Sequence, residues 1–253
     1  MLEPRIIPCL LIHKGGLVKT VKFKQPKYVG DPLNAVRIFN EKKVDEIMVI
    51  DIDASVKEEE PNLKLIENLA AECQMPLCYG GGIKTIDSAQ QIFQLGVEKI
   101  SLSSVIFENK SLIRELSNSV GSQSVVVTLD IKKNFFGKRK IYIHNGKHQI
   151  KMELADCVKM IQDEGAGEII INNIDNDGTM KGYDHELANY LKEKISIPLT
   201  IMGGAGSIND FKDVLRKHPI IGLAAGSFFV FKGKYKAVLI SYQREKILEN
   251  NYE

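Results

Sequence analysis

The sequence predicts an α/β fold, a single (β/α)8 TIM barrel with an internal half-barrel repeat. Three observations support this prediction. Apolar strands alternate with amphipathic helices at about one strand per 30 residues, the spacing that such barrels show. Four sequence elements of the first half recur in the same order in the second half. Glycine-rich, serine-rich and acidic turns follow the strands, which is where barrels place their active sites.

The bulk composition is that of an ordinary globular protein. The chain has 253 residues, of which 44% are hydrophobic and 26% charged, and its net charge of +2 gives no global field that would favour nucleic acid. The apolar run 6–12 is too short to span a membrane, and no cleavage-site pattern follows it. The four cysteines are scattered without a CxxC pair, as is typical of reduced thiols. We therefore expect a cytoplasmic protein without a metal or cofactor.

The predicted elements follow one another along the whole chain. A buried strand over 6–12 leads into a basic glycine turn, and Asp31 is an N-cap followed by Pro32 at the first helical position. The continuous apolar run 46–51 is typical of a strand buried on both faces. Further strands are predicted at 75–81, 98–104, 123–130, 167–175, 197–204 and 220–227, and further helices from Pro61, over 86–95, and after residues 153, 184 and 207.

The two halves of the chain resemble one another. The pairs are "LLIHK" (10–14) with "LDIKK" (129–133), 50–55 with 174–179, 80–87 with 203–210, and 101–104 with 224–227, at separations of 119 to 124 residues. Such a repeat favours a closed barrel over a doubly wound open sheet, the alternative architecture. We expect one domain over 1–253, with half-barrels at about 1–122 and 123–240.

Two glycine-rich turns, each followed one strand later by a serine turn, predict phosphate binding. Glycine lets backbone N–H groups approach an anion, and a helix that begins after the serine adds its positive end. A tight strand-to-helix turn is the alternative reading, but the pattern occurs twice. We expect a ligand with two phosphates. The predicted binding residues are Gly81, Gly82, Ser103 and Ser104 in one half and Gly203, Gly204 and Ser227 in the other.

Two segments that enter the same mouth, 13–30 and 131–152, are rich in lysine and contain no acidic residue. They favour an anionic ligand. Within the second segment, 140–150 is expected to form a hairpin with Asn-Gly at its turn. His144 and His148 lie four residues apart on that hairpin, a spacing that does not bring two strand side chains together on a metal.

Asp130 is the candidate for acid–base catalysis, because a long apolar strand delivers it into a cationic segment. The other strand-end aspartates can alternatively cap the helices that follow them. These are Asp51, Asp53, Asp175 and Asp177. The repeat places Leu11 at the position that corresponds to Asp130. Leucine has no proton to exchange, and its burial opposite Asp130 would raise the pKa of that carboxyl by desolvation.

These residues resemble one known family. The stretches "RIIPCL", "VVVTLDIKK", "GAGEIII", "IDNDGTMKGYD" and "GGAGS" are similar to the cyclase subunit of imidazole glycerol phosphate synthase, over residues 1 to about 240. The resemblance implies a (β/α)8 barrel that binds a ribonucleotide with two phosphates. It also implies a glutaminase subunit on the opposite face, whose ammonia enters the barrel past a ring of charged residues. This ring matches Arg5, Glu46, Lys99 and Glu168.

The resemblance also assigns ligand-binding and catalytic positions. The phosphate sites match Gly82, Ser103, Ser104, Gly204 and Ser227, although serines replace the usual Asn-Thr pair at 103 and 104. Asp130 matches one of two catalytic aspartates, and Lys19 matches a residue of the flexible first loop. We expect Asp51, Asp177 and Lys19 to support catalysis.

The other catalytic aspartate of the family falls on Leu11, so the resemblance does not extend to the complete reaction. Loss of a general acid costs about 10²–10⁴-fold in rate. Barrels with this defect are similar to paralogues that, with their glutaminase, supply ammonia to a separate amidotransferase. That enzyme makes acetamidino groups on surface or sialic-acid-like sugars. We expect this role, in a glutamine-dependent synthase or lyase complex, with greatly reduced cyclase activity.

Three alternatives remain. The first is an authentic cyclase of histidine biosynthesis that uses Asp130 with altered partners. The second is a scaffold that only activates the glutaminase, which the retained charged ring disfavours. The third is a sugar-phosphate isomerase of the related barrel type, which would need acids at both 11 and 130. No nucleic-acid or membrane partner is expected.

Overall fold

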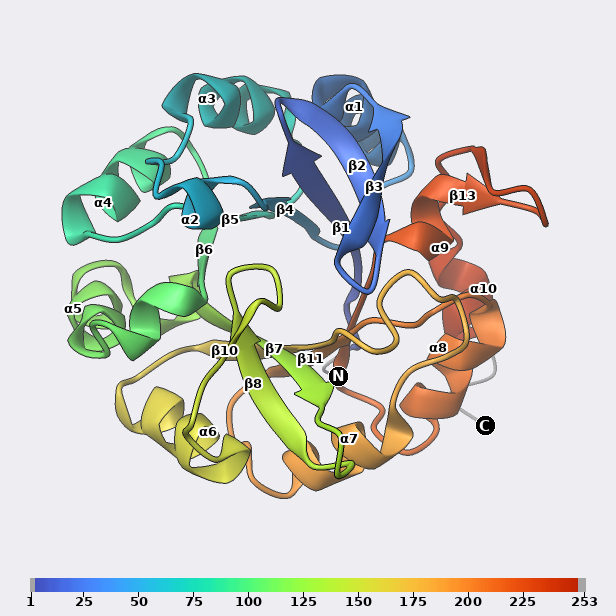
Figure 1. The fold of residues 1–253 in the computed structure, drawn as a ribbon. Helices are drawn as coiled ribbons and strands as arrows, with labels where there is room; N and C mark the ends of the chain where they lie inside the picture. The colour runs from blue at the N-terminus through green and yellow to red at the C-terminus, as the bar shows by residue number, and fades with distance from the viewer. Residues whose placement is uncertain (1–2, 250–253) are drawn as a thin grey trace.

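Eight parallel strands form a closed barrel in the computed structural model, which describes residues 3–249 (Figure 1). The barrel strands are β1 (Ile6–His13), β4 (Ile47–Asp51), β5 (Leu77–Gly80), β6 (Lys99–Leu102), β7 (Val125–Lys133), β10 (Glu168–Asn173), β11 (Leu199–Met202) and β12 (Gly222–Ala225). Each pairs with its neighbour in chain order, and β12 pairs with β1, so that Leu223 lies opposite Ile6. The ring therefore confirms the predicted (β/α)8 barrel and excludes the open sheet.

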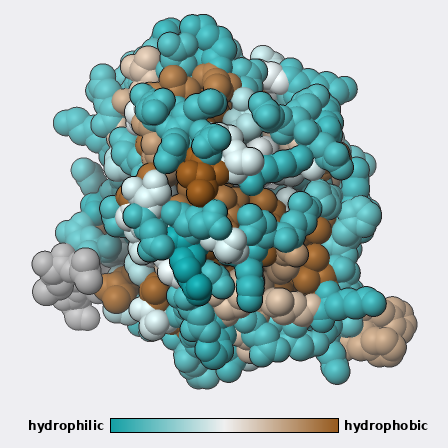
Figure 2. Space-filling model, turned by 90° about the vertical axis from the view of Figure 1, so that its left-hand side faces the viewer, coloured by the Kyte–Doolittle hydropathy of each residue, from teal (hydrophilic) through white to brown (hydrophobic). Residues whose placement is uncertain are grey.

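Helices surround the barrel and connect its strands (Figure 1). They are α1 (Pro32–Glu41), α2 (Ala54–Lys57), α3 (Leu63–Glu72), α4 (Ile86–Gln94), α5 (Ser111–Val120), α6 (Leu154–Asp163), α7 (His185–Lys192), α8 (Ile208–Leu215), α9 (Ser227–Val230) and α10 (Arg244–Leu248). The outward surface on the side of α4 and α5 is mostly hydrophilic, with apolar residues showing between polar ones (Figure 2).

The helix starts follow capping chemistry. The side chain of Asp31 accepts the backbone N–H of Asn34 at 2.9 Å, as its prediction as an N-cap requires. The next long helix, α3, begins two residues later than predicted. Its cap is Asn62, whose side chain accepts the N–H of Leu65 at 3.0 Å, so Pro61 lies outside the helix.

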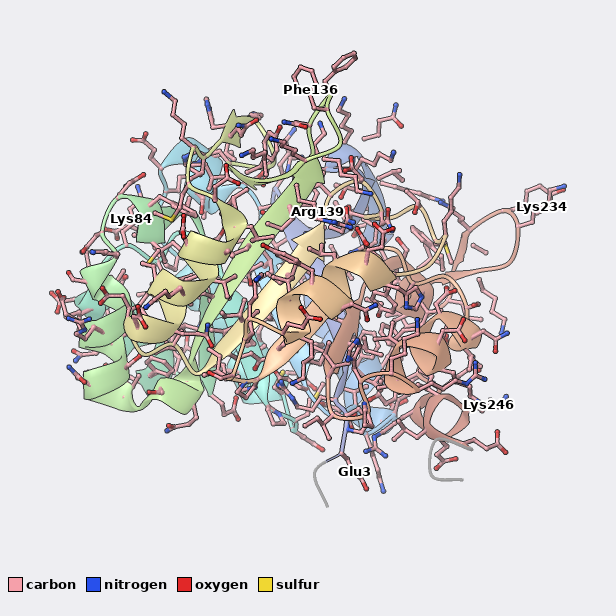
Figure 3. The ribbon with its side chains drawn as sticks, turned by 90° about the horizontal axis from the view of Figure 1, so that it is seen from below. Glu3, Lys84, Phe136, Arg139, Lys234 and Lys246 are labelled. Carbon is pink, nitrogen blue, oxygen red and sulfur yellow. The ribbon has the colours of Figure 1, made fainter. Side chains whose placement is uncertain are left out.

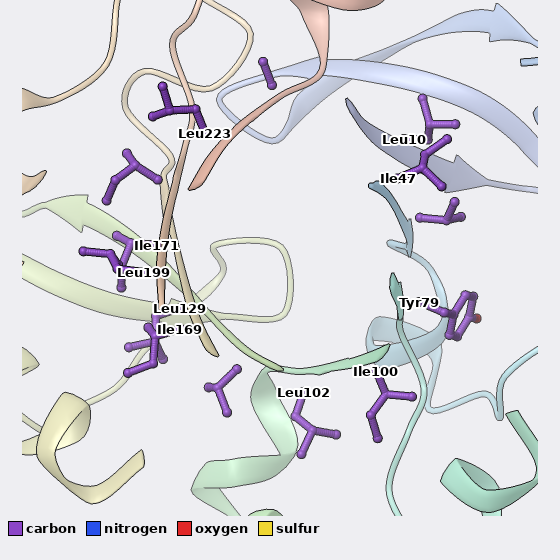
Figure 4. Packing of buried hydrophobic residues seen from close by; sticks show 14 of the residues in the cluster. Leu10, Ile47, Tyr79, Ile100, Leu102, Leu129, Ile169, Ile171, Leu199 and Leu223 are labelled. Carbon is purple, nitrogen blue, oxygen red and sulfur yellow. The ribbon is translucent and has the colours of Figure 1, made fainter. Parts of the chain in front are cut away.

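Side chains alternate along each strand between the barrel interior and the helices, which explains the continuous apolar runs. On β1, Ile6 and Leu10 join the outer core beneath the helices, whereas Ile7 and Cys9 lie in the interior. Figure 4 shows outer-core residues such as Tyr79 around the outside of the strand ring. The interior core consists of Ile7, Cys9, Met48, Cys78, Val126, Ile170, Met202 and Ala224.

Two hairpins extend from the mouth, each continuing one barrel strand. β2 (Gly16–Val21) pairs with β1 and with β3 (Lys24–Gly30). β8 (Arg139–Ile143) pairs with β7 and with β9 (His148–Gln149). The second hairpin was predicted, and both residues of its Asn145-Gly146 turn have positive φ. The first is not predicted, because the lysine-rich composition of 13–30 indicates only a basic loop. A third hairpin, β13 (Phe231–Lys232) with β14 (Ala237–Val238), follows α9.

Other expectations concern composition and ligands. Within 3–249, no helix combines the length and the apolarity that crossing a membrane requires. All four cysteines are free thiols. In the same part of the chain, no three His, Cys, Asp or Glu side chains gather in a way that could hold a metal ion. The single domain over 1–253 and the half-barrel boundaries stay predictions.

Candidate functional site

A cavity of about 310 Å³ opens at the carboxyl ends of the strands. Side chains of the adjacent strands β6, β7 and β10 form what we call the polar wall: Ser101, Thr128, Asp130 and Asn172. Side chains of β1, β4 and β11 form the apolar wall: Leu11, Ile50 and Met202. The mouth is therefore chemically divided, with oxygen-bearing groups on one side and hydrocarbon on the other.

Asp130 is the ionisable group of the polar wall. It lies opposite Asn172 in the β7–β10 register, and the Asn172 side-chain amide donates to Asp130 Oδ1 at 2.9 Å. Burial raises the pKa of Asp130 to about 7, although the hydrogen bond from Asn172 lowers it. A carboxyl with this pKa is present in both protonation states near neutral pH, so Asp130 can give or accept a proton. The direction agrees with the sequence-based expectation.

Leu11 lies across the cavity from Asp130. β1 and β7 are four positions apart in the eight-strand ring, so they stand on opposite sides of the barrel. Leu11 and Asp130 line the same cavity, and Leu11 also packs against the interior core. The β1 side of the cavity thus meets Asp130 with hydrocarbon rather than with a second carboxylate.

Asp51 and Asp177 both lie close to the cavity, in different surroundings. Asp51 lines the cavity and its Oδ1 accepts the N–H of Ala54 at 3.2 Å at the start of α2. Asp177 is buried, and its Oδ2 accepts the hydroxyl of Thr20 at 3.1 Å. Burial raises the pKa of both carboxyls; backbone N–H groups oppose this at Asp51, and the charge of Lys19 opposes it at Asp177.

Asp53 and Asp175 hold the loops in place instead of lining the cavity. Asp53 Oδ2 accepts the N–H of Lys14 at 2.9 Å, and Asp175 Oδ2 accepts the N–H of Lys133 at 2.8 Å. Asp53 also pairs with His13 Nδ1 at 2.7 Å. These contacts fix the two segments that leave β1 and β7, and neither side chain caps the helix that follows it, which was the structural alternative for strand-end aspartates.

The first predicted phosphate site opens into the cavity. Gly81, Gly82, Ser103 and Ser104 all line it. Gly81 has φ +117°, and a Cβ there would lie 2.4 Å from the backbone oxygen of Asp51, so only glycine fits. The helix expected after Ser103 is a single 3-10 turn over Ser104–Phe107, so its N-terminal contribution is that of one turn.

The second predicted phosphate site lies in a separate hollow of about 30 Å³. Gly203, Gly204, Ser227 and Lys19 line it. Lys19 is 5% exposed and its Nζ donates to the backbone oxygen of Cys9 at 3.4 Å. A Cβ on Gly226 would lie 1.8 Å from this Nζ. The Nζ of Lys19 therefore lies beside Gly226, the residue before Ser227, in the same hollow.

The two hairpins cross the mouth and dock on opposite sides. In the first, Lys22 donates its N–H to the backbone oxygen of Asp177, beyond β10, at 2.9 Å. In the second, Asn145 Nδ2 donates to the backbone oxygen of Ile52, beyond β4, at 2.8 Å. Phe23, at the tip of the first hairpin, lies beside the turn of the second. The hairpins thus roof the cavity together.

The basic segments divide between the cavity and the rim. Lys19 enters the second hollow, whereas Arg139 pairs with Asp184 at 3.1 Å on the rim. Lys140 pairs with Glu153. Figure 3 shows the mouth upwards, with Phe136 on the turn between β7 and β8 at the top and Glu3 at the opposite end. The acid-free segments therefore bring fewer cations to the ligand space than their composition indicates.

Four charged side chains meet at the other end of the barrel interior, and we call them the charge cluster. Arg5 lies 2.6 Å from Glu46 and 2.6 Å from Glu168, and Lys99 lies 2.8 Å and 3.2 Å from the same carboxylates. The Thr200 hydroxyl donates to Glu168 at 2.6 Å. The sequence-predicted ring is thus a mutually paired network, with both glutamates 3% exposed.

Pairing favours the ionised forms of Arg5, Lys99 and Glu168. Burial lowers the pKa of Arg5 and Lys99, but Glu168 and Glu46 together outweigh it, so the pKa of both is raised. Burial raises the pKa of Glu168, but the hydrogen bonds from Arg5 and Thr200 and the charges of Arg5 and Lys99 together outweigh that effect, so the pKa is lowered. Buried charges are tolerated because each has partners, and removal of one partner leaves another uncompensated.

Sequence reasoning missed part of the site. Asn172 and Thr200 were not singled out, although both lie at inward positions of predicted strands, where a polar residue is unusual. Phe23 was missed with its hairpin, and the partial period-two pattern of 16–24 was the available signal. Asn145 was read as a turn residue only, because its contact with Ile52 joins residues 93 positions apart.

Comparisons with known proteins place the chain. It matches the family model described as "Histidine biosynthesis protein" over residues 5–236. It is 54% identical over 254 residues to the provisionally named imidazole glycerol phosphate synthase subunit hisF3 of Vibrio vulnificus, with 98% of each chain covered. Identity to the provisionally named subunit hisF2 of Pseudomonas aeruginosa is 50%, with 96% of each covered.

A relative named without qualification is more distant. Identity to the imidazole glycerol phosphate synthase subunit HisF of Alkaliphilus metalliredigens is 36% over 229 residues, with 90% of this chain and 91% of the relative covered. Both groups of relatives align over nearly the whole barrel. The chain therefore belongs to the histidine biosynthesis protein family, as a barrel of its HisF-like branch.

Proposed function

We propose that this chain is the barrel subunit of a glutamine-dependent complex and conducts ammonia from a glutaminase partner to its mouth. The charge cluster carries the proposal. Arg5, Glu46, Lys99 and Glu168 form a polar network at the end of the interior opposite the cavity. An apolar plug would close the barrel at lower desolvation cost, so a retained polar network favours a gate that a small polar molecule passes.

The same proposal explains Leu11. A ring-closing cyclase reaction needs proton transfer on both sides of the substrate, and Leu11 presents hydrocarbon opposite Asp130, where the family has its second catalytic aspartate. We propose that the barrel binds a phosphorylated small molecule but makes little imidazole product. Its ammonia serves a separate cytoplasmic amidotransferase, which forms acetamidino groups on a surface or sialic-acid-like sugar. The identity to the provisionally named subunits is higher than that to HisF of Alkaliphilus metalliredigens, which supports a paralogue of the cyclase and leaves the sugar role to experiment.

One observation favours the second candidate, an authentic cyclase of histidine biosynthesis. Asp130 has a pKa of about 7 and lies in the same cavity as Gly82 and Ser104, so an acid–base group and a phosphate site are both present. An assay with the ribonucleotide substrate and ammonium salt separates the candidates, because ammonium salt bypasses any partner. Near-normal turnover would establish the cyclase.

The gate is tested with the purified glutaminase partner. We expect the barrel to bind it and to raise its glutamine hydrolysis. Lys99→Ala should leave binding of the glutaminase intact and reduce the share of ammonia that reaches the mouth. The reason is that Glu46 and Glu168 each lose the cation that lies within 3.2 Å of them, so the polar network of the proposed gate is altered. Lys64→Ala, which removes an exposed lysine of α3, is the control. Absence of both complex and stimulation would refute the proposal.

A further inference from the structure

Two adjacent phenylalanines are almost fully exposed on the turn between β7 and β8. Phe135 is 97% exposed and Phe136 is 83% exposed. Figure 3 shows Phe136 projecting beyond the rest of the molecule at the mouth end of the barrel. Neither ring belongs to the hydrophobic core, so the fold itself does not require phenylalanine at these positions. Adjacent apolar side chains left in water are typical of an interaction site.

The turn holds both rings in one arrangement. The side-chain oxygen of Asn134 accepts the backbone N–H of Phe136 at 3.0 Å and that of Lys138 at 2.9 Å. The backbone of Asn134 also bonds to Lys138 at 2.8 Å and to Gly137 at 2.9 Å. The two rings meet edge to face, with 5.6 Å between their centroids. We call residues 134–138 the aromatic tip. Because the tip is already ordered, a partner that buries it removes little conformational entropy.

Positive charge surrounds the aromatic tip. Lys133 and Lys138 flank it, and both are exposed. Neither forms an ion pair with another residue of 3–249, whereas Arg139 and Lys140, farther along β8, are paired with acidic side chains. The tip therefore combines an apolar centre with an uncompensated cationic border. Such a surface complements an acidic surface that encloses an apolar pocket.

We propose that the aromatic tip is the docking site of a protein with an acidic surface around an apolar pocket, and that this protein is the ammonia acceptor. The identity of the partner rests on the proposed function, but the chemistry of the surface does not. The tip continues β7, the strand that carries Asp130, so a protein seated on it lies beside the opening of the cavity. The two rings supply about 300–500 Å² of contact area. One side of a standard interface contributes about 800 Å².

The charges beside the tip favour a protein over a membrane surface as the occupant. Glu153 and Glu186 pair with Lys140 and Arg139, and their side chains remain 64% and 80% exposed. A flat anionic bilayer would repel these carboxylates while it attracted the lysines. A protein surface, in contrast, can present charge of either sign at each position.

The test uses the full barrel in complex with its glutaminase, together with the purified acceptor amidotransferase. Affinity is measured by biolayer interferometry. We expect Phe135→Ser combined with Phe136→Ser to weaken binding at least about 30-fold, because buried aromatic anchors dominate the affinity of interfaces. Lys133→Glu combined with Lys138→Glu should slow association about tenfold at low salt and less at high salt. Tyr235→Ser is the matched control. It removes an 89% exposed aromatic ring from the turn between β13 and β14, at the outer edge of the barrel (Figure 1), and should have no effect.

Glutamine hydrolysis should be the same in every variant, which shows that each barrel is folded and bound to glutaminase. Absence of amidotransferase binding, or equal affinity in the double phenylalanine variant, would overturn the docking site. Binding to phosphatidylglycerol vesicles that this variant loses, with amidotransferase affinity unchanged, would assign the tip to a membrane surface and also overturn the proposal.

The docking site and the proposed function fail in different ways. If the amidotransferase binds through the tip but the barrel neither binds nor stimulates the glutaminase, the proposed function is refuted and the docking site stands. If ammonia still reaches the amidotransferase undiminished in the double phenylalanine variant, the docking site is refuted and the proposed function stands.

Discussion

Leu11 on β1 and Asp130 on β7 face one cavity from opposite sides of the barrel. One contributes hydrocarbon and the other a carboxyl whose pKa burial raises to about 7. Around them, the glycine turns, Ser104 and Asp51 also line the cavity. Position 11 thus offers no proton-transfer group opposite Asp130, and Asp51, the second aspartate of the lining, accepts backbone N–H groups at the start of α2.

Leu11→Asp should create cyclase activity. With the ribonucleotide substrate and excess ammonium salt, we expect barely detectable turnover in the unaltered barrel and an increase of about 10²-fold in the variant, the lower end of what a general acid contributes. Turnover is measured as imidazole glycerol phosphate formed per barrel. Leu11→Asn, which has similar shape but no exchangeable carboxyl proton, is the control. Equal activity in the two variants would contradict the explanation.

Asp130→Asn should change how stability depends on pH. The folded protein keeps the Asp130 proton to about pH 7, whereas the unfolded chain releases it near the ordinary value of 3.8. The folded state therefore binds more protons in this range, and the free energy of unfolding falls as pH rises towards 7. Relative to the unaltered protein, the variant should gain about 2 kcal/mol between about pH 5 and pH 8.

Urea denaturation at the two pH values measures this difference. Asp213→Asn changes an exposed aspartate of α8 that pairs with Arg216 on the surface, and should show no comparable gain. A parallel pH dependence for Asp130→Asn and the unaltered protein would mean that the carboxyl is not desolvated.

The charge cluster should behave as one unit. Lys99→Met leaves Glu46 and Glu168 with Arg5 as their nearest cation and should reduce the free energy of unfolding by about 3 kcal/mol, the lower end for a broken buried ion pair. Adding Glu46→Gln removes the surplus negative charge, so the double variant should lose less than the two single losses together. A coupling energy of about 0.5–3 kcal/mol in a double-mutant cycle is expected. Strict additivity would contradict the network.

The first phosphate site should depend on glycine geometry. Gly81→Ala puts a Cβ 2.4 Å from the backbone of Asp51 at positive φ, so the turn must move. We expect at least a tenfold loss of inorganic phosphate affinity by calorimetry, on the scale of one lost charge-assisted hydrogen bond. Gly137 also has positive φ but no atom within 4 Å, so Gly137→Ala is the matched control. Phosphate bound elsewhere in soaked crystals, with Gly82 and Ser104 uncontacted, would contradict the assignment.

The barrel could be predicted because its evidence is local and repeated. Runs such as 46–51 and 167–175 are largely apolar on both faces of a strand. Asp31 and Ser207 are typical N-cap residues, so they indicate where helices begin. Residue types at strand ends also located the cavity, since barrels place their loops there. The half-barrel division is tested by superposing 5–120 on 124–240.

Contacts between distant segments could not be predicted in the same way. The residues around Lys19 in the sequence do not indicate that its Nζ lies beside Gly226 in the second hollow. That position depends on how the first hairpin folds across the mouth. The Oδ1 of Asn172, which has no hydrogen-bond partner within residues 3–249, likewise depends on the direction of one side-chain amide. The sequence predicts a helix after Ser103, whereas the structure has a single 3-10 turn there. The residues after Ser103 do not distinguish the start of a helix from such a turn.

The crossed docking of the hairpins has a mechanical consequence. The hairpin that continues β1 is hydrogen-bonded beyond β10 through the backbone N–H of Lys22. The hairpin that continues β7 is hydrogen-bonded beyond β4 through the side chain of Asn145. Each hairpin thus leaves one side of the strand ring and is held by a hydrogen bond to the opposite side. Opposite sides of the strand ring are therefore joined across the mouth, so movement of either hairpin away from the cavity requires the loss of one of these two hydrogen bonds.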